Sequence, residues 1–382
     1  MGTRVRGLNR SFGVRELVLC EGAVAVAAAG AAGGPAWTVP GVAAGAAGVS
    51  LVVLRRGGRS VFGWLAVAAA FRARRRRGDS ACAGLDRYAY ERRRGPAGAR
   101  EVGMVGDGTF LTAVVRVEVS DAGLRPADGA AELPWDLLAG ALEVDDVVLA
   151  SAQVVQQVRG AAAGTAAVRG AGTAGGTRAG GGAPVVRATW VALRLEPELC
   201  PEAVAARGGG PGGAQRCLVR AADQVASRLT EVHGLRATVL DQPGLDSALG
   251  AARCGGPGLA VGGEESVRAW CGEGRAHTVY AFGGDPRDAV ALAAALPGEA
   301  AVAATVSLTL RHRRARGVVG GVGVRRAGAE GHVRVTCAEE SELDRVREEL
   351  ARGFRAARLD LVRMDWEQLP GLRATLPLGG AW

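Results

Sequence analysis

The first residues to consider are those that could bind a nucleotide. The segment Gly320–Gly328 reads GGVGVRRAG, which does not keep the G-x-G-x-x-G spacing of a dinucleotide-binding loop and leads into a predicted strand. A P-loop requires a lysine, and all 47 basic residues of this 382-residue chain are arginine. Arg311–Arg316 (RHRRAR) could contact phosphates, but between two predicted strands it is typical of a solvated hairpin tip. The sequence therefore predicts no nucleotide cofactor.

Residues that could bind a metal are scattered along the sequence. Cys254, Cys271 and His277 form the only loose cluster among the seven cysteines and four histidines. Zinc sites usually contain closely spaced pairs of ligands, which this cluster lacks, so we predict no metal site. The odd number of cysteines and the absence of a C-x-x-C motif indicate free thiols in a reducing compartment such as the cytoplasm.

No serine, cysteine or pair of carboxylates stands in a recognisable catalytic setting. Asp285 follows two glycines and could face a ligand, but an Asp-Pro pair is also a strong helix start, since it supplies a capping oxygen and then a proline at the first helical position. Helix capping therefore accounts for Asp285. We predict no catalytic, cofactor-binding or metal-binding residues, and accordingly no enzymatic activity.

Strands and helices alternate through most of the chain without strict βαβ regularity, which predicts an α/β (mixed-sheet α+β) domain. Its first part covers 101–159 and contains a predicted β-hairpin around GDGT (106–109). Its second part covers 184–382 and contains a helix that Thr336 and Glu339 should open as a capping box. Between them, 160–183 is rich in Gly and Ala and is predicted to be a flexible linker or loop.

The N-terminal region is apolar and is flanked by arginines. Its two stretches, Leu17–Gly34 and Ala36–Leu54, approach the length of a membrane span and predict a transmembrane helical hairpin over 17–54. Both spans are rich in Ala and Gly, which contribute little transfer free energy, and Glu21 lies inside the first. A cleaved signal peptide and a buried hairpin of a soluble protein are the alternatives.

The net charge of +9 is concentrated beside this hairpin. Residues 1–16 form a basic N-terminus, and 55–77 contain eight arginines and no acid, so both ends of the hairpin should be cytoplasmic. We predict an Arg-rich juxtamembrane region over 55–100, with an interfacial helix or a third span at Val61–Phe71 and then an irregular connector. Arg55–Arg77 should bind anionic lipid headgroups. The remaining chain is nearly neutral, which argues against nucleic acid as a partner.

Several segments, taken in order, resemble a known family. They are RRGGRSVFGWL leading into RARRRR, VGDGTFLTAVVRVEV, ALPGEAAVAATVSLTLR (295–311), HVRVT with its following helix, and the terminal TLPLGG (375–380). Together they resemble EccE, a membrane subunit of actinobacterial type VII (ESX) secretion systems. The resemblance implies a structural subunit that assembles with EccB, the ATPase EccC and EccD in an inner-membrane channel.

The predicted function is that of a non-enzymatic subunit of a type VII secretion complex, which anchors a cytoplasmic interaction domain. The predicted location is the bacterial inner membrane, as a multi-pass protein with both termini in the cytoplasm. The alternative function is a membrane-tethered α/β enzyme such as a glycosyltransferase-like protein, which rests on the fold class alone. A third possibility, a binder of anionic lipid or nucleic acid, rests only on the juxtamembrane arginines.

Overall fold

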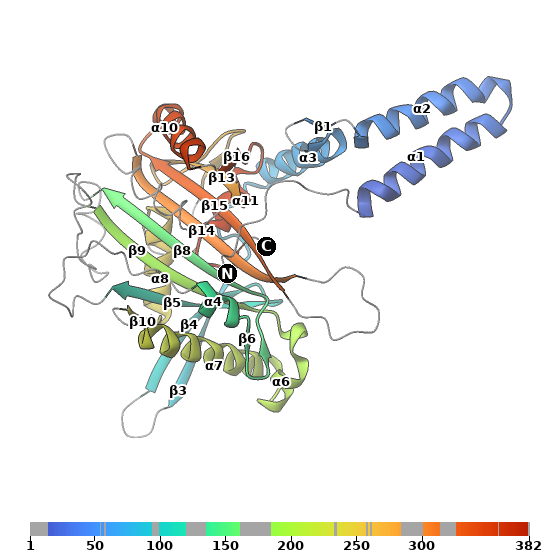
Figure 1. The fold of residues 1–382 in the computed structure, drawn as a ribbon. Helices are drawn as coiled ribbons and strands as arrows, with labels where there is room; N and C mark the ends of the chain where they lie inside the picture. Colours follow the sequence, from blue (N-terminus) through green and yellow to red (C-terminus); the bar gives the residue numbers. More distant parts are fainter. Residues whose placement is uncertain are drawn as a thin grey trace. The chain divides into compact units, whose positions relative to one another are not determined.

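The computed structural model divides the chain into two compact units, Gly7–Arg77 and Gly78–Trp382. Each unit is described by itself (Figure 1). The structure describes residues 14–53, 55–56, 59–93, 99–119, 135–160, 185–232, 235–256, 259, 262–283, 301–313, 326–357 and 359–380. Of the predicted linker at 160–183, Gly160 ends strand β8 and the other residues lie outside the described residues, as does the helix expected after Asp285.

The first unit consists of a helical hairpin followed by a third helix. Helices α1 (Val14–Ala32) and α2 (Pro35–Val53) pack along each other, and α3 covers Val61–Arg77 after the short strands β1 (Arg55–Arg56) and β2 (Arg59–Ser60). Small residues set the helix contact: a Cβ atom built on Gly30 would lie 2.5 Å from the Cα of Gly41. The two helices therefore approach closely because their contact positions carry no side chain.

The predicted transmembrane hairpin at 17–54 is wrong. Among the described residues, no helix combines the length and the hydropathy that a membrane span requires. Each helix of the hairpin has 19 residues, and these are largely Ala and Gly, whose side chains contribute little to transfer into lipid. The predicted multi-pass arrangement depended on these spans, and it is corrected with them.

The second unit is built on one 12-stranded sheet in which all described pairings are antiparallel. Its main path runs in the order β11-β12-β13-β15-β14-β8-β9-β5-β4-β3, with β10 paired to β5 and β16 paired to β13. The strands are β3 (Asp86–Arg93), β4 (Ala99–Gly106), β5 (Leu111–Val119), β8 (Ser151–Gly160), β9 (Val185–Leu195), β10 (Leu235–Val239), β11 (Glu264–Glu265), β12 (Trp270–Gly272), β13 (Arg275–Gly283), β14 (Ala301–Arg313), β15 (Arg326–Cys337) and β16 (Asp360–Arg363).

Helices accompany this sheet on both faces. They are α4 (Trp135–Gly140), α6 (Pro201–Ala206), α7 (Gly210–Glu231), α8 (Gln242–Arg253), α10 (Leu343–Ala356) and α11 (Gln368–Ala374). Two 3-10 turns, η2 (Pro197–Leu199) and η3 (Glu340–Glu342), and a small hairpin of β6 (Glu143–Val144) and β7 (Val147–Val148) complete the unit.

The predicted mixed sheet is also wrong, for a topological reason. The crossover β9-α7-β10 does not join neighbouring strands, because β9 and β10 pair with β5 from opposite sides. The crossover β15-α10-β16 encloses β13 in the same way. In each strand-helix-strand unit, a third strand therefore lies between the two strands that the helix connects. Every hydrogen-bonded pair is then antiparallel. Sequence alternation alone does not reveal that insertion.

The second unit contains an internal repeat of eight elements. The series β3-β4-β5-β8-β9-α7-β10-α8 is followed by β11-β12-β13-β14-β15-α10-β16-α11, and corresponding elements occupy corresponding places. The strand order reads the same from both edges toward the β8–β14 junction. The sheet thus consists of two similar halves joined at β8 and β14.

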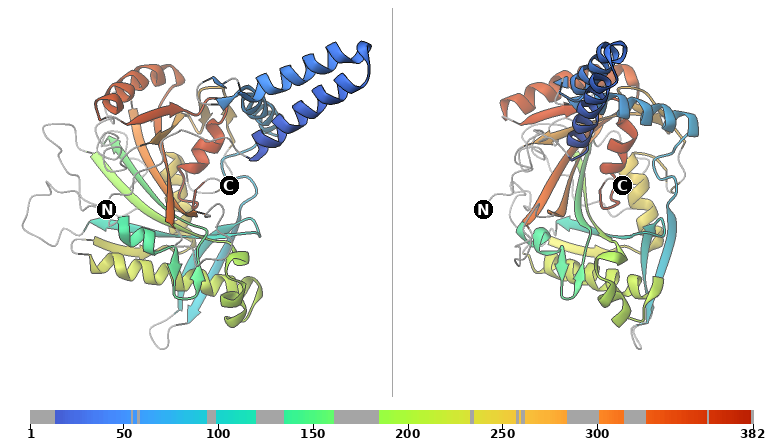
Figure 2. Two further views of the ribbon diagram at one scale, coloured as in Figure 1. Left: turned by 45° about the vertical axis from the view of Figure 1, so that its right-hand side comes forward. Right: turned by 90° about the vertical axis from the view of Figure 1, so that its right-hand side faces the viewer.

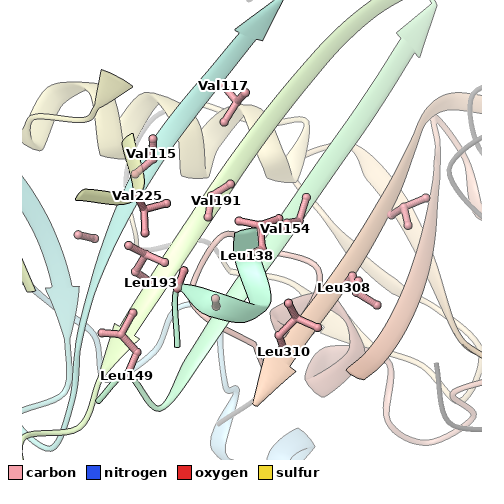
Figure 3. Close-up of a cluster of buried hydrophobic side chains, with 14 of the residues drawn as sticks. Val115, Val117, Leu138, Leu149, Val154, Val191, Leu193, Val225, Leu308 and Leu310 are labelled. Atoms are coloured by element: carbon pink, nitrogen blue, oxygen red, sulfur yellow. The ribbon is translucent and has the colours of Figure 1, made fainter. Parts of the chain in front are cut away.

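One face of the sheet carries the larger apolar core. Apolar side chains of the central strands pack there against α4 and α7 (Figure 3), and the same core includes the apolar side chains of α10. The opposite face is covered by α8, α11 and the C-terminal segment, and Figure 2 (right) shows these two helices on the same side of the central strands. This second core is smaller, and it surrounds a polar region along β8 and β14.

One local prediction is confirmed, and two are corrected. The hairpin around GDGT forms, with Gly106 opposite Leu111. The capping box lies three residues later than predicted, between Glu339 and Glu342, because β15 continues as far as Cys337. Strand β3 occupies 86–93, where we expected an irregular connector. Its alternating charged and tyrosine residues (DRYAYERR) are the signal that indicates a strand there.

Candidate functional site in a polar seam of the sheet

Polar side chains line one face of the two central strands. Because side chains alternate across a strand, the register between β8 and β14 places seven buried polar residues on the face that α8 and α11 cover. Six of them, here called the polar seam, are Ser151, Gln153, Gln157, Thr305, Ser307 and Thr309, and the seventh is Arg159. Buried polar groups are costly unless they are hydrogen-bonded, so their partners indicate what the seam does.

Gln153 uses both ends of its amide to hold the C-terminal segment. Its Nε2 donates to Ser307 Oγ and to the Ala374 carbonyl, each at 2.8 Å. Its Oε1 accepts from the backbone N–H groups of Leu378, Gly379 and Gly380, at 3.1, 2.8 and 3.0 Å. A single buried side chain thus satisfies three backbone donors that have no strand partner.

Further contacts hold the same segment. Thr112 Oγ1 donates to the Leu378 carbonyl at 3.1 Å, and Ser151 Oγ donates to the Gly379 carbonyl. Leu376 and Leu378 are completely buried in the smaller core. The terminal motif TLPLGG (375–380) is therefore held against the face of the sheet that α8 and α11 cover. We call this segment, together with the residues that hold it, the C-terminal clasp.

The GDGT loop lies beside this clasp. Asp107 Oδ1 accepts from Thr109 Oγ1 at 2.6 Å and from the backbone N–H of Thr109 at 2.8 Å, which closes the loop. The guanidinium of Arg194 stacks 3.7 Å from the centre of the Phe110 ring, and its Nη2 lies 3.1 Å from Glu196 Oε1. A Cβ on Gly379 would lie 2.6 Å from the Cβ of Arg194. Two motifs far apart in sequence thus meet around one arginine.

Three buried arginines gather at the other end of the seam. Arg159, Arg253 and Arg334 are 7%, 1% and 0% exposed. Arg159 and Arg334 donate to the Ala251 and Ala252 carbonyls in the last turn of α8. Cations are favourable at a helix C-terminus because the helix dipole is negative there. The arginines therefore attach the end of α8 to strands β8 and β15.

Burial dominates the electrostatics of this cluster. Arg253 Nε lies 3.6 Å from Glu273 Oε2. Arg334 Nε and Nη1 have no hydrogen-bond partner among the described residues. Burial is the largest of the effects that lower the pKa of Arg334 to about 10; Cys254 opposes this shift, and the charges of Arg159 and Arg253 add to it. The group remains protonated at neutral pH.

His277 lies next to this cluster and is 1% exposed. Its Nδ1 is 3.0 Å from Thr336 Oγ1, and its ring lies 5.5 Å from that of Trp270. Burial, followed by the positive charges of nearby arginines, holds the pKa of His277 well below 6.5. The imidazole is therefore neutral in the folded protein, where it is a buried, uncharged polar side chain.

We expect His277 to make the folding free energy depend on pH. Below pH 6.5 the unfolded chain binds a proton at this histidine and the folded chain does not, so stability is lost as pH falls. The slope from one such group approaches about 1.4 kcal/mol per pH unit. Urea unfolding of wild type and His277→Gln between pH 5 and 7.5 tests this. If the two chains lose stability with equal slopes, His277 does not titrate between the two states.

The structure does not bring the loose Cys/His cluster together. Cys254 Sγ accepts from Gln157 Nε2 at 3.5 Å, whereas Cys271 Sγ lies 3.8 Å from Glu340 Oε2. His277 is opposite Trp270 in the ladder, so it points to the other face from Cys271. Among the described residues, no group of three or more His, Cys, Asp or Glu side chains is placed to hold a metal.

The candidate nucleotide segments also belong to different places. Arg311–Arg313 ends strand β14, and 326–328 begins strand β15, so the described parts of both segments are strand residues that pair with each other. Residues 314–325 and Asp285 lie outside the described residues. The described residues of these segments therefore do not support a nucleotide-binding site.

Comparison with known families matches one part of the chain. Residues 183–282, which include β9, α7, β10, α8 and most of β13, match the family model described as "Putative type VII ESX secretion system translocon, EccE". This part of the chain is similar to the EccE family, which agrees with the sequence resemblance and supports an association with type VII secretion. No curated protein matches the chain.

The residues that organise this site were not singled out from the sequence. Gln153 and Gln157 are polar positions next to the buried valines of β8, which is the signal that marks them. Arg334 is the central residue of HVRVT. It shares its face of β15 with His332 and Thr336 and lies opposite Thr305 of β14, where it is completely buried. A charged residue in a fully buried strand looks identical in sequence to one on a solvated face.

Proposed function

We propose that this protein is a non-enzymatic subunit that helps to assemble the type VII secretion complex, with its folded domain (78–380) serving as an interaction module for EccB, EccC and EccD. The observation that supports this most directly is how the polar seam is used. Gln153, Ser151 and Ser307 of the seam, joined by Thr112 of β5, direct hydrogen bonds at the chain's own C-terminal segment. Groups engaged in this way stabilise a scaffold.

The glycosyltransferase-like alternative loses its only support. It rested on a predicted mixed α/β sheet, and the sheet is antiparallel throughout its described pairings. The fold class therefore gives no reason to expect nucleotide-activated substrates.

Assembly is tested by co-purification from membranes in mild detergent. The tagged full-length chain should carry EccB, EccC and EccD with it, and loss of the chain should reduce export by the system. Asp107→Ala and His277→Gln should affect export only as far as they lower stability. A variant that stays folded and co-purifies normally, yet abolishes export, would contradict the non-enzymatic role.

We also propose that the arginines of 55–77 bind anionic lipid headgroups. Helix α3 ends in four successive arginines, Arg74–Arg77, and exposes Phe62 and Leu65 at 42% and 55%. A basic helix with exposed apolar side chains suits a peripheral lipid interface. The charges attract headgroups, and the apolar side chains give the helix a second means of attachment.

Replacing Arg74–Arg77 by serine should weaken binding to vesicles of phosphatidylglycerol and phosphatidylcholine by about 1 kcal/mol per arginine, and salt should weaken wild-type binding in the same way. Flotation of the purified chain with vesicles measures this. The matched control replaces four exposed arginines of α10 by serine: Arg345, Arg347, Arg352 and Arg355. Equal losses in both variants would mean that total charge, and not α3, determines binding.

A further inference from the structure

The two edges of the sheet differ although the two halves correspond. The edge strand of the second half, β11, has two residues, whereas its counterpart β3 has eight. Proteins usually keep free edges short, because an exposed row of backbone N–H and C=O groups pairs readily with another strand. Only one half of the repeat follows this rule. Within the described part of the chain no strand pairs with the outer side of β3, which lies at the lower edge in Figure 1, so β3 is a long edge with which another strand can pair.

The side chains of β3 alternate between the two faces of the sheet. Tyr88 and Tyr90 are half-buried and pack on the larger apolar core. Arg87, Ala89 and Glu91 are exposed on the opposite face. Arg87 Nε lies 3.0 Å from Asp246 Oδ1 of α8, and its side chain is still 47% exposed. Glu91 lies opposite Glu101 in the β3–β4 ladder, and its side chain makes no hydrogen bond or ion pair within the part of the chain that the structure describes.

The sequence of β3 is complementary to itself in one antiparallel register. When two copies pair about a two-fold axis at Ala89, residues whose numbers are equally distant from 89 face each other. Arg87 of each copy then lies opposite Glu91 of the other, and Tyr88 lies opposite Tyr90. Opposite charges facing each other across strands are favourable, and this register forms that pair twice.

Neighbouring registers lack this match. An axis at Arg87 or at Glu91 places like charges directly opposite each other, which is unfavourable. An axis at Tyr88 places Arg87 opposite Ala89 and forms no charge pair. An axis between two residues is excluded, because residues that face each other must point to the same side of the sheet. The register centred on Ala89 is thus distinguished by charge and not only by geometry.

We propose that β3 is the docking edge for a second copy of this chain, which pairs antiparallel through β3 with the axis at Ala89. The two sheets then continue into each other, and the partner is another copy because the charge pattern of β3 complements itself. This interface is separate from the polar seam and from the C-terminal clasp. It does not depend on the proposed function, and it would give the secretion component a contact between its own copies.

Charge exchange tests the register on the purified full-length chain in mild detergent. Analytical ultracentrifugation over a range of concentrations should show a monomer–dimer equilibrium for wild type. Glu91→Arg should weaken dimerisation about tenfold, because two attractive pairs become repulsive. Adding Arg87→Glu to that variant should recover most of the loss, since the pairs are then reversed. The midpoint of thermal unfolding at low concentration should stay unchanged for Glu91→Arg, because its side chain is exposed.

Cross-linking provides a second, independent readout. Ala89→Cys should form a disulfide-linked dimer under mild oxidation, because the two residues face each other at the axis. Ala83→Cys is the matched control, since it is also exposed but lies six positions away from the axis. A wild-type chain that stays monomeric, a dimer indifferent to Glu91→Arg, or equal cross-linking at positions 83 and 89 would each overturn the proposal. Cross-linking of position 89 to a different protein alone would do so as well.

Discussion

Replacement of Gln153 by leucine is expected to destabilise the folded domain by about 3–5 kcal/mol, since buried donors lose their partners at about 1–3 kcal/mol each and the effects overlap. Gln153 is 0% exposed, and its Oε1 is the acceptor for three successive backbone N–H groups of the clasp. Leucine removes that acceptor and leaves the donors in a low-dielectric interior. The C-terminal segment should then detach from the sheet.

Urea unfolding and limited proteolysis measure the two parts of this effect. The midpoint of unfolding should fall, and the terminus should be cleaved in the folded state. Gln156→Leu is the matched control on the same strand, because Gln156 Nε2 makes one 3.3 Å hydrogen bond to Thr189 Oγ1 from a partly buried position. We expect that change to cost less than about 1 kcal/mol. If both variants are equally stable, the clasp is not held by Gln153.

Replacement of Gly103 by valine is the second large effect, with an expected loss of about 3 kcal/mol or more. Gly103 lies in β4, and its backbone is next to the residues that lead into α8. Its N–H donates to the Leu240 carbonyl at 2.9 Å. A Cβ at this position would lie 2.6 Å from the carbonyl carbon and oxygen of Asp241 and from the amide nitrogen of Gln242. Backbone atoms cannot move aside as a flexible side chain does, so α8 must shift.

The thermal midpoint should fall for Gly103→Val and, to a lesser extent, for Gly103→Ala. Gly160→Ala is the control, since Gly160 is also a strand glycine but a Cβ there has no atom within 4 Å. That change should be neutral or slightly stabilising, because alanine restricts the unfolded chain. Equal stability of the Gly103 and Gly160 variants would mean that α8 has room to move away from β4.

The sequence alone predicted the elements whose pattern is local. Turn residues marked the hairpin around Asp107 and Gly108, and helical spacing of Leu218, Val225 and Leu229 marked α7. The ordered motifs also indicated the EccE family, and a different part of the chain, 183–282, matches the model of that family. The hairpin and helix signals each lie within a few residues, so each is readable without knowledge of the fold.

Sheet topology was decided only by the tertiary structure. Alternation of strands and helices is the same whether a crossover joins adjacent strands or encloses a third, so the sequence could not distinguish a mixed sheet from an antiparallel one. The hairpin of α1 and α2 failed as a span for a related reason. Its Ala and Gly residues satisfy an apolar pattern, whereas crossing a membrane depends on the summed transfer free energy.

The candidate site was likewise fixed by long-range contacts. Gln153 holds residues more than two hundred positions away, and Arg334 meets the end of α8 from a strand in the other half of the repeat. Neither residue belongs to a motif, because the groups that each one satisfies are backbone atoms, which every sequence contains. The type of a side chain determines which hydrogen bonds it can donate or accept. Which unpaired backbone groups lie next to it is determined only by the fold.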